Sequence, residues 1–163
     1  STGRFTFIAD ATNTSEVFSG SAGDAEFGTV YALSTSAQYA DLAERYEADA
    51  FYEPGTVLVI GGEKEVTACN SINDVKLAGV VSTAPAYLMN NNVGSDVTHP
   101  AIALKGRVPV KVFGTVHKGD LLTTSAYAGH AELASAETSP LAIIGVALGT
   151  NVSGAGVVEV MIK

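Results

Sequence analysis

Cysteine, basic residues and long apolar runs are all scarce in this 163-residue sequence, and each scarcity excludes a class of function. The one cysteine, Cys69, has no second thiol for an internal disulfide or for a zinc site of the usual multi-thiolate kind. Nine Lys and Arg residues are spread thinly among 17 Asp and Glu residues, and the formal net charge is −8. We therefore expect no binding to nucleic acid or to an anionic membrane surface. No apolar run approaches the ~20 residues of a membrane-spanning helix, so we expect no membrane insertion.

The composition that remains favours a compact domain with many tight turns. Charged residues make up 16% of the chain, below the about 25% that is usual for globular proteins, while hydrophobic residues make up 47%. Glycine occurs 17 times. A weakly charged, glycine-rich surface is typical of a domain that buries part of that surface in an oligomer. The alternative is a compact monomer whose surface is rich in Ser, Thr and Asn.

From residue 52 onward, short apolar segments alternate with glycine turns, a pattern that predicts β-strands. Val57–Ile60 precedes Gly61-Gly62, a dipeptide typical of a hairpin turn. Two strands are expected at 101–104 and 108–113, separated by Lys105-Gly106-Arg107. The spacing of the turns is typical of a barrel or sandwich rather than of alternating strands and helices. The predicted fold class is therefore mainly β, a barrel-like or sandwich domain.

Two segments in the first part of this region are echoed in the second part. The segment Glu53–Leu58 resembles His117–Leu122, and the segment Leu77–Val81 resembles Ile143–Ala147. The offset along the chain is nearly the same for both pairs. This agreement predicts two similar β-halves, each too small to fold alone, that close into one barrel-like core. The alternative is chance similarity among strands that follow glycine turns.

The N-terminal part of the chain has a different character. Residues 1–37 are rich in Ser, Thr, Gly and Ala with short apolar pieces, and we expect an extended β-segment that pairs with strands elsewhere. Residues 38–163 form the predicted C-terminal domain, which begins with one short helix at 38–48. The apolar stripe of that helix has the spacing i, i+3, i+4, i+7 and consists of Tyr39, Leu42, Ala43 and Tyr46.

No motif in the sequence points to a metabolic enzyme. The three histidines lie far apart and lack the His-x-x-x-His spacing of a helical metal site. The sequence has no Gly-x-Ser-x-Gly nucleophile elbow and no Gly-x-x-x-x-Gly-Lys-Ser/Thr phosphate loop. We therefore expect no metal site and no cofactor.

Several stretches, taken in order, resemble a C-terminal module of phage tail fibres and tail-fibre-like virion proteins. They are Tyr39–Glu47, Glu53–Leu58, Ala78–Asn90, His99–Val112 and Lys118–Leu122, and together they span about residues 36–163. The resemblance implies a homotrimer at the distal end of a fibre or spike in the virion. Three chains that associate first at this end fix the register in which the fibre winds. Residues 1–37 would then be the end of the shaft or a strand-exchange collar.

A more distant similarity is to the self-cleaving, G2-type chaperone domain of phage neck-appendage spikes. It is carried by Tyr39–Glu47 and by Gly79–Ser82. It implies an intramolecular chaperone whose cleavage leaves Ser1 at the new terminus, assisted by Asp41 and Glu44. The alternative is that both carboxylates are solvated charges of a helix, with Asp41 paired to Arg45.

Binding of a host receptor or surface glycan is a third hypothesis, and it concerns the loops. The polar loop at 90–98 is long enough to be functional or to lie at an interface. Tyr87, Asn91 and Tyr127 are the candidate binding residues, the two tyrosines as rings on which a sugar stacks. The alternative is that each tyrosine is a half-buried residue at the rim of the core.

Overall fold

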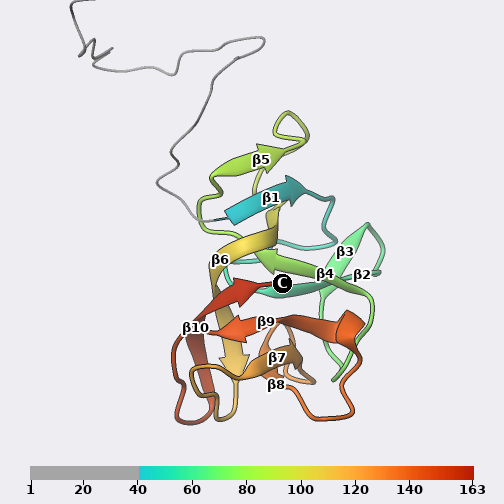
Figure 1. The fold of residues 1–163 in the computed structure, drawn as a ribbon. Coiled ribbons are helices and arrows are strands. Elements are labelled where there is room, and N and C mark those ends of the chain that lie inside the picture. The colour runs from blue at the N-terminus through green and yellow to red at the C-terminus, as the bar shows by residue number, and fades with distance from the viewer. Residues whose placement is uncertain (1–40) are drawn as a thin grey trace, which may run out of the picture. The chain divides into compact units, whose positions relative to one another are not determined.

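The domain is built from short β-strands, as the sequence predicts, and a computed structural model describes residues 41–163 of it (Figure 1). The extended segment predicted for 1–37 lies outside the described residues. In chain order the elements are β1 (Asp41–Arg45), β2 (Val57–Ile60), β3 (Val66–Ala68), β4 (Leu77–Val81), β5 (Tyr87–Met89), β6 (Ala101–Phe113), β7 (Leu121–Thr124), β8 (Ala131–Leu133), the 3-10 helix η1 (Pro140–Ala142), β9 (Ile143–Ala147) and β10 (Ala155–Ile162).

Five strands in the second part of the chain close into a barrel, which we call the second ring. β6 pairs with β10 in antiparallel register from Gly106 to Phe113, and the path continues through β9, β7 and β8. β8 returns to β6 through the pair of Val112 and Ala131, which completes the circuit. The predicted barrel-like architecture is therefore confirmed.

The first part of the chain repeats this arrangement around the other end of β6, in what we call the first ring. β6 pairs there with β1 and β4, and the path runs from β4 through β2 to β3. The chain just after β1 returns to β3 through a parallel bridge between Ala48 and Val66. Both rings share β6, which is one continuous strand where the sequence predicted two. The strand continues through Gly106, whose φ of 118° suits glycine.

The two rings also agree in register, which confirms the predicted duplication. In each ring the second strand pairs with the fourth through three matched pairs and has a register shift at the same point. The pair of residues that closes each ring corresponds too. Ala48 and Val66 close the first ring, Val112 and Ala131 close the second, and the offset along the chain is nearly the same for both residues. The matched pairs are Val57–Val80, Leu58–Gly79 and Val59–Leu77 in the first ring, and Leu121–Val146, Leu122–Gly145 and Thr123–Ile143 in the second.

Each ring has its own apolar interior, so the structure has two cores where the sequence predicted one. The smaller core fills the first ring and contains Leu58, Val66, Val81 and Ile102. Their equivalents in the larger core, which fills the second ring, are Leu122, Ala131, Ala147 and Val160. The larger core also takes in five buried residues of the first ring, so the second ring covers the outer face of the first. These residues are Val57, Val59, Cys69, Val80 and Ala103, of which Val57, Val80 and Ala103 are 0% exposed.

The predicted helix at 38–48 is wrong over the described residues 41–48, because β1 forms there instead. Asp41 and Ala43 are buried while Leu42 between them is exposed, which is the period of two of a strand. Intrinsic helix propensity amounts to less than about 1 kcal/mol for each ordinary residue. β1 supplies hydrogen-bond partners for one edge of β6, and unpaired backbone groups are costly when buried. Pairing with a distant strand therefore overrides the local pattern.

Candidate functional site

One segment breaks the correspondence between the two rings. The N–H of Ser82 donates to Ala101 O at 2.8 Å in the first ring, and the N–H of Leu148 donates to Glu159 O at 2.7 Å in the second. The segment between Ser82 and Ala101 is longer than the segment between Leu148 and Glu159. The first half therefore carries an insertion here. This insertion contains β5, which pairs with β1, and the polar loop 90–98. The second ring closes without an equivalent of this insertion.

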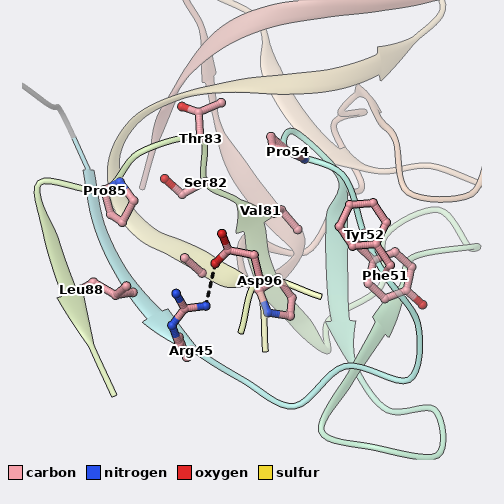
Figure 2. Close-up of a pocket in the computed structure, with 12 residues that line it drawn as sticks. Arg45, Phe51, Tyr52, Pro54, Val81, Ser82, Thr83, Pro85, Leu88 and Asp96 are labelled. Atoms are coloured by element: carbon pink, nitrogen blue, oxygen red, sulfur yellow. Dashed lines mark hydrogen bonds and ion pairs between the residues drawn. The ribbon is translucent and has the colours of Figure 1, made fainter. Parts of the chain in front are cut away.

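The insertion, β1 and the end of β4 enclose a pocket of about 330 Å³ (Figure 2). Phe51 and Tyr52, from the segment between β1 and β2, form one side of it. Pro85 and Leu88 lie on the opposite side, as Figure 2 shows. Side chains from three separate stretches of the chain therefore meet around one space, which tertiary structure alone brings together.

Arg45 organises the charge of this pocket. Its side chain is 12% exposed, and its Nη1 donates to Asp96 Oδ1 at 2.7 Å and to His99 O at 2.6 Å. Asp96 belongs to the inserted loop and is 81% exposed, so the ion pair reaches the rim of the pocket. The pair has zero net charge, and it presents both hydrogen-bond donors and acceptors.

Three buried polar atoms beside the pocket have no hydrogen-bond partner among the described residues. They are Arg45 Nε, Asp41 Oδ2 and Ser82 Oγ. Asp41 and Ser82 are each 6% exposed. Burial raises the pKa of the Asp41 carboxyl above its ordinary value, and the nearby Ser82 hydroxyl partly opposes that rise. Asp41 and Ser82 therefore lie beside each other. Buried polar groups in folded proteins are nearly always hydrogen-bonded, so Arg45 Nε is the exception that marks the site.

Two of these polar groups, those of Arg45 and Ser82, have apolar counterparts in the second ring. When the repeats are aligned by their strand pairs, Arg45 corresponds to Pro109 and Ser82 corresponds to Leu148. Asp96 lies within the insertion and therefore has no equivalent. Sequence reasoning missed all three of these residues as a site, although the change in offset along the internal repeat is a signal that points to the insertion and hence to Asp96.

The two carboxylates predicted to assist self-cleavage lie on different faces of β1. Asp41 is buried, whereas Glu44 accepts hydrogen bonds from Tyr46 Oη at 2.7 Å and from Asn90 Nδ2 at 2.8 Å. The bond to Glu44 raises the pKa of Tyr46 to about 12. The alternative pairing of Asp41 with Arg45 does not form, because Arg45 pairs with Asp96. Ser1 lies outside the described residues, so cleavage before it stays a prediction.

The predicted receptor-binding residues fall at two separate places. Tyr87 is 65% exposed on β5 and Asn91 is exposed in the loop that follows, so both belong to the insertion. Tyr127 follows β7, at the far end of the domain from β5 in Figure 1. Its ring stacks on Phe113 with 4.4 Å between centroids and meets His130 edge-on at 4.7 Å. The three residues therefore do not form one site, and the binding role of each stays a prediction.

Other reactive features of the described residues are inert or absent. Cys69 is fully buried, its Sγ–H donates to His130 O at 3.2 Å, and burial raises the pKa of its thiol. Residues 41–163 contain no group of three or more His, Cys, Asp or Glu side chains placed to hold a metal ion. Over the same residues, no helix has the length and apolar character needed to cross a membrane.

A scan against protein-family models found no matching family, and a search of curated proteins found no match to this chain.

Proposed function

We propose that this chain is a virion structural domain that forms a homotrimer and caps the C-terminal end of a phage tail fibre or spike. The sequence resemblance to tail-fibre modules supports the setting. The internal duplication supports the association, because an apolar surface that is covered in the first ring has an uncovered equivalent in the second ring.

One apolar surface is buried in the first ring and open in the second, and this observation carries the proposal. In the first ring, Val57, Val80 and Ala103 are covered by the second ring and are 0% exposed. The equivalent residues of the second ring are Leu121, Val146 and Met161, which lie in one cross-strand row over β7, β9 and β10. Leu121 is 41% exposed and Met161 is 46% exposed. These three residues form an apolar surface of the second ring that we call the open face.

The first ring shows what kind of partner suits such a face. There the cover is another ring of the same construction. The surface that this ring uses for the contact is not equivalent to the surface that it covers. In each copy that covering surface is already used within the chain, so we infer that a second copy covers the open face with another of its surfaces. An interface between unlike surfaces is heterologous, and it closes into a cyclic assembly such as a trimer when the rotation between copies allows it. Burying each half-exposed apolar side chain would contribute about 1 kcal/mol per interface.

Light scattering on the full chain tests this proposal. We expect a mass three times the 16.6 kDa of one chain. Leu121→Glu and Met161→Glu place a charge in the interface and should give single chains. Val97→Glu, at a residue that is 60% exposed in the inserted loop, is the matched control and should leave the mass unchanged. A folded single chain at high concentration, a dimer, or a trimer that survives both open-face variants would refute the proposal.

A further inference from the structure

We propose that the pocket between β1, β4 and the insertion binds one uncharged sugar unit of a glycan. This inference goes beyond the assembly proposed above and does not depend on it, because every residue that lines the pocket lies between Arg45 and Ala101 of one chain. It concerns a different part of the domain from the open face, whose strands are β7, β9 and β10.

The shape and apolar lining of the pocket suit a small ring. Its volume of about 330 Å³ lies at the lower end of the about 300–1,000 Å³ typical of small-molecule sites. Phe51 is 58% exposed at its edge, an unusual exposure for a large aromatic side chain. The C–H face of a sugar ring packs well against an aromatic ring of this kind. Pro85 and Leu88 on the opposite side confine the ligand.

The polar groups suit hydroxyls, which both donate and accept hydrogen bonds. The guanidinium of Arg45 donates, the carboxylate of Asp96 accepts, and the hydroxyl of Ser82 does both. Arg45 Nε is buried and lacks a partner among the described residues, so a ligand or its bound water would satisfy a group that the fold leaves unsatisfied. The Arg45–Asp96 pair also fixes the orientation of both side chains before a ligand arrives, which reduces the entropy lost on binding.

The charge of the pocket favours an uncharged ligand over an anionic one. The positive charge of Arg45 is already matched by Asp96 at 2.7 Å, so no excess positive charge remains there for a phosphate or a carboxylate. The buried carboxyl of Asp41 lies on the same face of β1 as Arg45 and would further disfavour an anion. The insertion that supplies Asp96 has no counterpart in the second half.

Saturation-transfer NMR on the full chain tests the assignment. The probes are glucose, galactose, mannose and N-acetylglucosamine, with sialic acid and inorganic phosphate as charged comparators. We expect at least one neutral sugar to receive saturation. We also expect Phe51→Ala and Asp96→Ala each to weaken its binding at least tenfold. Thr115→Ala alters the residue of the second half that corresponds to Phe51 and should leave binding unchanged.

Three outcomes would overturn the assignment. They are no saturation of any neutral sugar, binding of sialic acid or phosphate alone, and neutral-sugar binding that either pocket variant leaves intact. The melting temperature of each variant is measured beside its binding, and both substitutions fall at exposed side chains, so folding should persist. Because the mass by light scattering is unaffected by the pocket, a failure here is distinguishable from a failure of the trimer.

Discussion

The strongest test of the duplicated architecture is the replacement of one glycine in each ring by alanine. Gly79 and Gly145 occupy equivalent places in β4 and β9, each beside the register shift with its neighbouring strand. A Cβ on Gly79 would lie 2.5 Å from Ala103 O, where ordinary contacts begin at about 3.4 Å, and the φ of Gly79 is 152°. A Cβ on Gly145 would meet the equivalent carbonyl, Met161 O, even more closely. Since both obstacles are backbone atoms of a paired strand, neither can move aside without opening the sheet.

The magnitude follows from that geometry. Overpacking in a tight interior costs about 1–3 kcal/mol, and each ladder hydrogen bond that is lost adds about 0.5–1.5 kcal/mol. We therefore expect Gly79→Ala and Gly145→Ala each to lower the free energy of unfolding by about 3 kcal/mol. Urea titration followed by far-ultraviolet circular dichroism measures this. Gly149→Ala is the control, because its Cβ would make an ordinary contact of 3.5 Å with Val158 and should change stability by less than about 0.5 kcal/mol. A loss below about 0.5 kcal/mol for either test variant would refute the reasoning.

Two further predictions concern the cores and the buried carboxyl. Leu58→Ala and Leu122→Ala remove equivalent, fully buried side chains, and each should cost about 2–5 kcal/mol by urea titration. The larger loss is expected for Leu122→Ala, because the smaller core around Leu58 has half-buried edges that can collapse into the space left by the substitution. The reverse order would contradict this reasoning. Val152→Ala, at a site that is 79% exposed, is the control. For Asp41, burial raises the folded-state pKa, so the charged carboxyl destabilises the fold as pH rises through that pKa. Asp41→Asn should therefore be more stabilising, relative to the unchanged chain, at pH 7 than at pH 3, and an equal difference at both pH values in thermal unfolding would contradict the burial argument.

The sequence by itself determined the strand content and the duplication. Glycine turns and short apolar segments are local signals, so Val57–Ile60 and Leu77–Val81 could be placed as strands from the residues alone. The nearly constant offset between the repeated segments then identified equivalent strands, because a repeated unit that buries the same face must repeat its apolar pattern.

Only the tertiary structure decided how β1 and the pocket form. The residues 41–48 carry a helical apolar spacing, and they become a strand because β6, far along the chain, offers an edge with which they pair. The pocket likewise depends on Arg45, Ser82 and Asp96, which no local pattern connects. Local propensities amount to tenths of a kcal/mol per residue, whereas the pairing of a buried edge and the satisfaction of its backbone groups amount to several. Distant contacts therefore determined these features, and they exist only once the chain has closed both rings.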